Sequence, residues 1–118
     1  MSIHEYKRQN SFVVLLNATQ VIITFAVPSK CRVTTRKFSN YVDNVLAWGG
    51  IVWRLLRNGI PIPPYEAIRD PRGSQYLLDA MEPVTFYGGD LLEVIAENAY
   101  AGAASVGIGA ALGFDQEE

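Results

Sequence analysis

The chain has little of the residue types that support covalent or metal chemistry. Its 118 residues include one cysteine, Cys31, and one histidine, His4. A single cysteine excludes an internal disulfide, and a zinc site needs three or four ligands, mostly His or Cys. A Cys31–His4 pair would place the catalytic base in a polar terminal segment that orients a side chain poorly. We therefore expect no metal site, no cofactor and no enzymatic activity.

Charge and long apolar runs are also scarce. Charged residues make up 19% of the chain, and the formal net charge is −2. The first ten residues, MSIHEYKRQN, contain no apolar run, so we expect no secretory signal. The uncharged stretch at residues 98–114 is short for a membrane helix of about 20 residues and is diluted by glycine. We therefore expect no membrane as partner. Because the basic residues are few and the total charge is acidic, we also expect no nucleic acid as partner.

Carboxylates are the remaining side chains that could do chemistry. Glu93 and Glu97 lie on one face of a predicted strand, about 13 Å apart, whereas glycosidase pairs stand about 5–9.5 Å apart. Four aspartates fall near predicted turns: Asp43, Asp70, Asp79 and Asp90. A turn aspartate commonly accepts hydrogen bonds from its own backbone, and calcium binding in a sandwich module is the alternative.

The stretch GAASVGIGAALGF, residues 102–114, alternates large and small residues with a period of two. This pattern predicts an inner, paired strand whose core face is made by Val106, Ile108, Leu112 and Phe114. The opposite face is nearly bare and includes Gly107, Gly109 and Gly113. Glycine weakens a strand unless a neighbour must come close. We therefore expect the bare face to lie under an aromatic from a neighbouring strand or under another subunit.

Other segments carry the same pattern of β-branched and aromatic residues. They are residues 11–16, 20–27, 31–42, 51–59, 60–64 and 91–98. A change of phase between Val33 and Phe38 predicts a β-bulge, and Asn58-Gly59 is a strong hairpin signal. Residues 76–86 are ambiguous between a helical turn and extended chain. About eight short strands without a long helical pattern predict an all-β fold: an antiparallel, jelly-roll-like β-sandwich.

The domain organisation is expected to be simple. The sandwich covers residues 11–114, preceded by a flexible N-terminal arm (1–10) and followed by an acidic tail (115–118). Residues 1–37 hold six of the ten Lys and Arg residues and one of the twelve acidic residues. Such uneven charge can steer like subunits together or dock a charged partner, and a solvated surface is the alternative.

Aromatic residues in loops are the best candidates for contacts. Trp48 lies in the loop LAWGG and Tyr65 follows PIPP. Loop aromatics serve protein contacts or sugar stacking, and capping of the core is the alternative. The candidate interface residues are Trp48, Tyr65, Arg69, Tyr87, Tyr100, Gly107 and Gly109.

Three segments in order, FAVPSKCRVTTRKFSNYV, GGIVWRLLRNGIPIPPYEAIRDPRGS and VTFYGGDLLEVIAENAYAGAASVGIGAALGF, resemble small β-sandwich proteins of tailed bacteriophage particles. These are decoration (cement) or accessory virion proteins. The points of likeness are the VP that enters a long strand, the WRLLRNG hairpin with its prolines, GGD before LLEVIAEN, and the closing strand that ends in GF. The likeness covers about residues 25–114 and rests on strand and turn features, so no residue role is carried over.

The resemblance implies a structural virion protein that decorates or cements a capsid by binding the major capsid protein, or that binds another virion protein. We expect it in the virion, assembled in the host cytoplasm, as a homo-oligomer, either a trimer or a dimer. The alternative is a carbohydrate- or receptor-binding sandwich module of a phage tail or cell surface.

Overall fold

The computed structural model describes the backbone of residues 3–43, 50–63, 65–68, 79–102 and 105–118. The side chains of residues 3–12, 41, 79 and 80 lie outside this description. The described residues form nine strands and no α-helix, which confirms the all-β prediction. The strands are β1 (Ile3–Leu15), β2 (Thr19–Ala26), β3 (Arg32–Val42), β4 (Ile51–Arg57), β5 (Ile60–Pro61), β6 (Asp79–Ala80), β7 (Thr85–Tyr87), β8 (Leu91–Asn98) and β9 (Ser105–Glu117).

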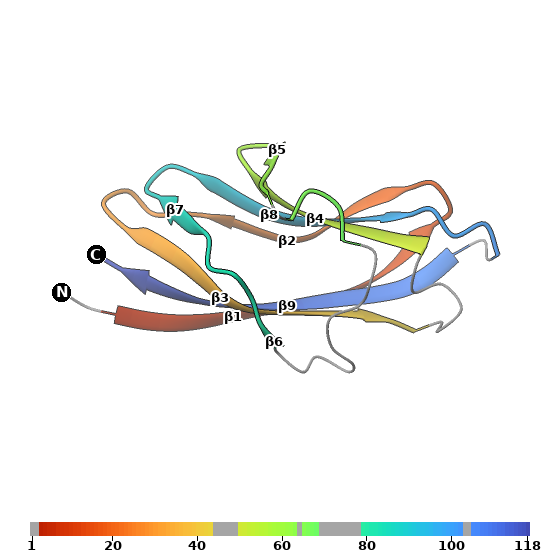
Figure 1. The fold of residues 1–118 in the computed structure, drawn as a ribbon, viewed down its shortest axis with the longest axis horizontal. Coiled ribbons are helices and arrows are strands. Elements are labelled where there is room, and N and C mark those ends of the chain that lie inside the picture. Colours follow the sequence, from red (N-terminus) through yellow and green to blue (C-terminus); the bar gives the residue numbers. More distant parts are fainter. Residues whose placement is uncertain (1–2, 44–49, 64, 69–78, 103–104) are drawn as a thin grey trace.

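The strands form two antiparallel sheets that face each other (Figure 1). One sheet has the order β1-β9-β3-β6, with β7 also paired to β3, and the other has the order β2-β8-β4-β5. The first half of the chain therefore pairs with the second half in reverse order: β1 with β9, β2 with β8, β3 with β6 and β7, and β4 with β5. This arrangement is a double Greek key, so the prediction of a jelly-roll-like sandwich is confirmed.

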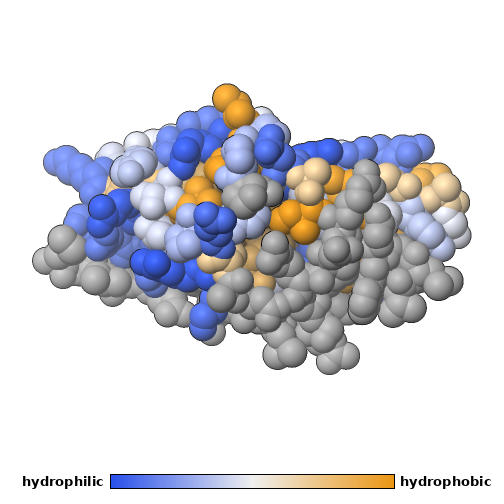
Figure 2. All heavy atoms as spheres, viewed as in Figure 1, coloured by the Kyte–Doolittle hydropathy of each residue, from blue (hydrophilic) through white to orange (hydrophobic). Residues whose placement is uncertain are grey.

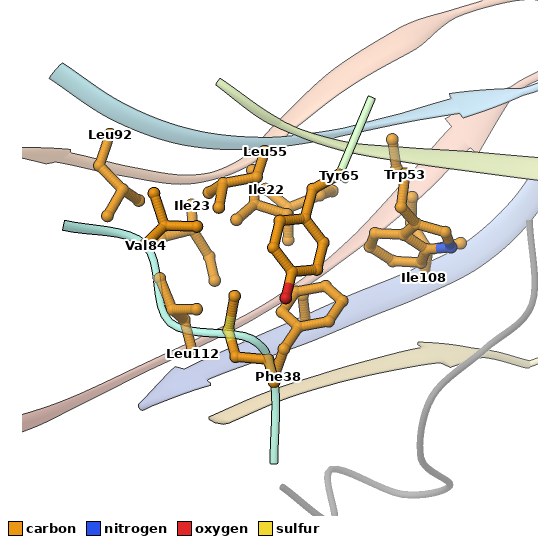
Figure 3. Close-up of a cluster of buried hydrophobic side chains, with 14 of the residues drawn as sticks. Ile22, Ile23, Phe38, Trp53, Leu55, Tyr65, Val84, Leu92, Ile108 and Leu112 are labelled. Atoms are coloured by element: carbon orange, nitrogen blue, oxygen red, sulfur yellow. The ribbon is translucent and has the colours of Figure 1, made fainter. Parts of the chain in front are cut away.

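The core lies between the sheets because each strand turns alternate residues toward the opposite layer. Figure 3 shows Trp53 and Leu55 of β4 on one side of this core, with Phe38 of β3 and Ile108 and Leu112 of β9 on the other. The rings of Phe38 and Trp53 meet edge to face, with centroids 6.3 Å apart and an interplanar angle of 74°. This contact joins the two layers with the geometry that aromatic pairs prefer.

Strand β9 is the inner strand that the period-two pattern predicts. It lies between β1 and β3 and pairs with both. Its even-numbered residues Val106, Ile108, Leu112 and Phe114 are all buried in the core. The strand therefore contributes its large side chains to the core and its small ones to the outer face of the sheet.

Two local signals in the sequence also take the predicted form. The pairing of β3 with β9 shifts register between Thr35 and Lys37, which is the predicted bulge. Asn58 and Gly59 both have positive φ, 52° and 82°, and connect β4 to β5. Two adjacent left-handed residues are what a type I′ hairpin turn requires.

The termini differ from the prediction of a loose arm over residues 1–10 and a free tail over residues 115–118. Strand β1 begins at Ile3, which pairs with Glu117 near the end of β9. Pairing with β9 provides hydrogen-bond partners for the backbone of this segment, so the segment forms a strand although its side chains are polar. In the ambiguous segment 76–86, the described residues 79–86 contain the short strand β6 and the first two residues of β7, and no helix.

Candidate binding surface

Three turns lie side by side at the end of the sandwich that carries both chain termini (Figure 1). They join β2 to β3, β4 to β5, and β7 to β8. The Val27 N–H donates to the carbonyl of Asp90 at 2.9 Å, and the Gly89 N–H donates to the carbonyl of Val27 at 3.0 Å. The Asn58 N–H donates to the carbonyl of Leu91 at 2.9 Å. We call this region the three-turn end.

Asn58 and Asp90 hold two of these turns together through their side chains. The Asn58 Nδ2 donates to Asp90 Oδ1 at 3.1 Å, and the Asn58 Oδ1 accepts from the Leu91 N–H at 2.8 Å. Asp90 Oδ2 accepts from the Tyr87 N–H at 2.9 Å. This last bond is the own-backbone bond that the sequence predicts for a turn aspartate.

These bonds stabilise the ionised form of the Asp90 carboxyl. The pKa of Asp90 is lowered from its ordinary value, first by the hydrogen bond from the Tyr87 backbone and next by the Asn58 side chain. Partial burial acts in the opposite direction, and the Arg57 guanidinium lowers the pKa slightly further. Asp90 therefore carries its negative charge at neutral pH within a closed set of donors.

Arg57 links the two sheets at the same end. Its Nε lies 3.5 Å from Asp90 Oδ2, and its guanidinium lies over the ring of Phe86, 4.9 Å from the ring centroid. The guanidinium also donates to the carbonyl of Thr85. Because β4 and β7 belong to opposite sheets, these contacts keep the three-turn end from opening.

A shallow groove beside the β4–β5 hairpin lies against this rigid support. Its volume is about 260 Å³, and its lining consists of Arg57, Asn58, Ile60, Pro61, Ile62 and Pro63. Ile60 is 68% exposed. Figure 2 shows hydrophobic atoms, in orange, projecting at the top of the molecule, where Figure 1 places β5. Pockets for small ligands usually hold about 300–1,000 Å³, so the groove is smaller than a typical small-ligand pocket.

The predicted interface residues separate into exposed and buried positions. Tyr87 is 59% exposed at the three-turn end, as an interface residue requires. Tyr65 is 4% exposed and belongs to the core, so its prediction as an interface residue is not supported. Its hydroxyl donates to the carbonyl of Glu82 at 2.8 Å, and Figure 3 shows its ring directed toward Phe38. Tyr65 is therefore the core-capping aromatic that was the alternative.

Tyr100 and Gly107 serve the opposite end of the sandwich. Tyr100 is half-buried, and a Cβ atom at either Gly50 or Gly102 would collide with it. A Cβ atom on Gly107 would collide with a carboxylate oxygen of Asp43. The other Asp43 oxygen accepts from the Gly107 N–H at 3.1 Å. Within the chain, the neighbour above Gly107 is thus an aspartate rather than the predicted aromatic.

Gly109 is buried within the single chain, where its backbone pairs with Ser11 of β1 and Tyr41 of β3. Its burial does not require another subunit. Trp48 and Arg69 lie outside the described residues, as does Asp70. The side chains of His4 and Asp79 are also outside the description.

Charge complementarity lies partly within the chain. Ion pairs join Arg32 to Glu117, Arg36 to Asp115, Arg54 to Glu97 and Arg57 to Asp90. The first two connect the basic segment of β3 to the acidic end of β9. These ion pairs therefore neutralise part of the uneven charge within the chain. Less unpaired charge remains that could steer other subunits.

Within the described ranges, no three His, Cys, Asp or Glu side chains come together as a metal-binding group. No helix in that part of the chain is long and apolar enough to cross a membrane. Cys31 is half-buried, with its sulfur 3.7 Å from the Gln116 Nε2.

Asn98 is a structural residue that the sequence did not single out. It is fully buried, its Nδ2 donates to the Val14 carbonyl at 3.1 Å, and its Oδ1 accepts from the Tyr100 N–H at 3.0 Å. These bonds tie β1 to the loop that follows β8. The signal in the sequence is an asparagine at the end of an apolar strand. An amide that is buried there needs hydrogen-bond partners, so such a residue can be expected to link neighbouring segments.

No protein-family model and no curated protein matches the sequence. Among solved structures, the chain has a weak likeness to dimeric latent PorU from Porphyromonas gingivalis, with 14% sequence identity and a TM-score of 0.33. The likeness covers 91% of this chain and 13% of the PorU chain. It does not bear on the fold or the function of this protein.

Proposed function

We propose that the chain is a structural protein of a bacteriophage particle that binds the major capsid protein, or another virion protein, without catalysing a reaction. The observation that carries the proposal is the pairing of exposed apolar side chains with a rigid support at the three-turn end. Ile60 and Tyr87 stand out from turns that are fixed by Asn58, Asp90 and Arg57. Binding to a partner costs less entropy when the contact residues are already held in place.

The jelly-roll topology is compatible with this role, because double-sheet jelly rolls occur in viral capsid proteins and lectins. Fold alone does not identify function. A partner side chain in the hairpin groove would bury Ile60 against Pro61 and Pro63, and an aromatic or aliphatic anchor of this kind contributes much of the binding energy in protein interfaces.

A carbohydrate- or receptor-binding module is the second candidate. Exposed Tyr87 favours it, because an aromatic ring can stack on a sugar face. Against it, the polar side-chain atoms of Asn58 and Asp90 in the neighbouring turns are engaged with each other and with the backbone. Sugar recognition needs polar groups that are free to bind hydroxyls.

Sedimentation with virus particles tests the proposal. Purified protein is mixed with bacteriophage particles assembled without it, and the pellet is quantified for the wild type and for Ile60→Lys. The variant should bind at least about tenfold more weakly, since about 1.4 kcal/mol of lost contact is a tenfold change. Val13→Lys is the matched control, because Val13 is 72% exposed but lies near the end of β1 that is away from the chain termini and the three-turn end. This variant should bind like the wild type.

Wild-type protein that stays in the supernatant with every particle fraction would contradict the proposal. Binding to an oligosaccharide array that Tyr87→Ala abolishes would favour the second candidate in its place.

A further inference from the structure

The four edges of the two sheets differ in how far they are protected against pairing with another chain. An open strand edge offers unpaired N–H and C=O groups, and proteins protect such edges with short strands, prolines, bulges or charges. Strand β5 has two residues including Pro61, β6 has two and β7 has three. Strand β2 shifts register between Val21 and Ile23 in its pairing with β8. Each of these three edges is therefore protected.

The second half of strand β1 has no bulge, proline or charge, although the carbonyls of Val14 and Leu15 at its end already accept from the Asn98 Nδ2 and the Ala18 N–H. The strand runs for thirteen residues, pairs with β9 without a register shift, and contains neither proline nor glycine. Among the described residues it pairs with β9 alone. Its charged residues Glu5, Lys7 and Arg8 lie in the first half, and residues 9–15 carry no charge. Near its end, Val13 is 72% and Leu15 is 64% exposed.

We propose that the free edge of β1 pairs antiparallel with β1 of a second copy of this chain, around a two-fold axis at Gln9. Pairing of identical edges makes a closed dimer, because each copy offers the same surface to the other. The two sandwiches then share one continuous sheet that crosses the interface. The main-chain hydrogen bonds are those by which an added strand extends a sheet.

The charge pattern of β1 disfavours two neighbouring registers and is compatible with this one. A two-fold axis at Lys7 or at Arg8 would place that residue opposite itself, and like charges directly opposite each other destabilise a strand pair. An axis at Gln9 aligns all thirteen residues and sets Ile3 opposite Leu15 and Glu5 opposite Val13. No charged residue then faces a residue of the same sign. The register with the most hydrogen bonds is thus also free of repulsion.

The free edge of β1 extends along most of the molecule. Thirteen residues at about 3.3 Å each give an edge about 43 Å long, and the longest principal axis measures 49 Å. The inference rests on the fold and holds whether or not the chain binds a virus particle.

Charge substitution at Val13 tests both the dimer and its register. In the proposed register Val13→Glu faces Glu5 of the other copy twice, so the dimer dissociation constant should rise at least tenfold by sedimentation velocity. Val13→Lys faces the same Glu5 and should keep or strengthen the dimer. Combining Val13→Glu with Glu5→Lys should restore it. Ile60→Glu is the matched control at 68% exposure and should leave the dimer unchanged.

A cross-link locates the axis independently. In a Cys31→Ser background, Gln9→Cys should form a disulfide between copies under mild oxidation, since residues that face each other on paired strands have suitable Cα separations. Ile60→Cys in the same background should not. The proposal is overturned if the wild type is monomeric at all concentrations up to about 1 mM, a concentration at which even a weak complex forms. It is also overturned if Val13→Glu and Val13→Lys act alike, or if Ile60→Cys cross-links as fully as Gln9→Cys.

The particle assay separates this inference from the proposed function. Ile60→Lys that loses particle binding but keeps the dimer supports both. A wild-type dimer that never binds particles contradicts the proposed function and leaves the β1 pairing in place.

Discussion

Strands β1 and β9 pair with each other over thirteen residues, but they differ in their other neighbours. β9 lies between β1 and β3, and its outer residues are small, Gly107 and Gly109 among them. β1 has β9 on one side and no strand on the other within the described residues. The difference shows why similar lengths of strand carry different sequences. A strand paired on both sides can consist of small and apolar residues, whereas an edge strand needs charges wherever it must avoid a partner.

The largest effect is expected from a charge inside β9. Ile108 is 1% exposed in the core. Ile108→Asp should lower the free energy of unfolding by several kcal/mol, because the carboxylate would be buried without a partner. Guanidinium unfolding checks this result. Val13→Asp on β1, measured at low concentration where the monomer dominates, should change stability by less than about 0.5 kcal/mol. Equal losses at the two positions would remove the contrast between the strands.

A second test concerns the bare face of β9. Gly109 is buried on a strand that is paired on both sides. Because burial leaves little room above it, Gly109→Leu should destabilise the monomer by about 1–3 kcal/mol through overpacking. Thermal unfolding gives the measurement. Ser105→Leu, at an exposed position on the same face, should have little effect or a small benefit from β-propensity. An unchanged melting temperature for Gly109→Leu would show that this face has room for a side chain.

The β4–β5 hairpin is a protected edge held by side-chain hydrogen bonds. A substitution in it should lower the free energy of unfolding by less than a charge in β9 does, and by more than a change in a turn without such bonds. Asn58→Ala should cost about 2 kcal/mol, since it loses hydrogen bonds worth about 1 kcal/mol and replaces asparagine, which tolerates the left-handed region, by alanine, which does so at a further cost of about 1 kcal/mol. Asn58→Gly keeps the conformation and should cost about half as much. If the two variants were equally stable in urea, backbone conformation would play no part.

The smallest effect is the pH dependence of the same turn. The pKa of Asp90 is lower in the folded chain than its ordinary value. The unfolded chain therefore binds more protons in the interval between the two values, so stability rises with pH through that interval. The contribution is present above about pH 4 and is lost as pH falls through the lowered pKa. Urea midpoints should fall more steeply toward low pH in the wild type than in Asp90→Asn. Parallel curves would assign the acid sensitivity to other groups.

The parts of the fold that could be predicted are those with a local signal. The alternation of residues 102–114 identifies an inner strand, because each residue's environment repeats every second position. The phase change between Val33 and Phe38 marks the bulge, and Asn58-Gly59 marks the hairpin turn. Each of these signals is contained within a few residues of the chain.

The parts that could not be predicted depend on distant segments. Strand β1 is polar over its first residues, and its partner β9 lies about 100 residues away in sequence, so a loose arm was the local reading. Tyr65 follows a proline-rich turn but folds back on β4, where its carbonyl accepts from the Leu55 N–H at 3.0 Å. The bond between Asn58 and Asp90 also spans 32 residues. Sequence patterns give no register for such contacts.

Amide hydrogen exchange of β1 at two protein concentrations tests the central claim most directly. Alternate amides of an edge strand point away from its neighbour. In the proposed dimer these outward amides of residues 3–15 are bonded to the second copy, so they should be protected at high concentration and exchange rapidly after dilution. Amides of β9, bonded within one chain, should be equally protected at both concentrations. Outward β1 amides that exchange rapidly even at high concentration would contradict the pairing of β1 with a second copy.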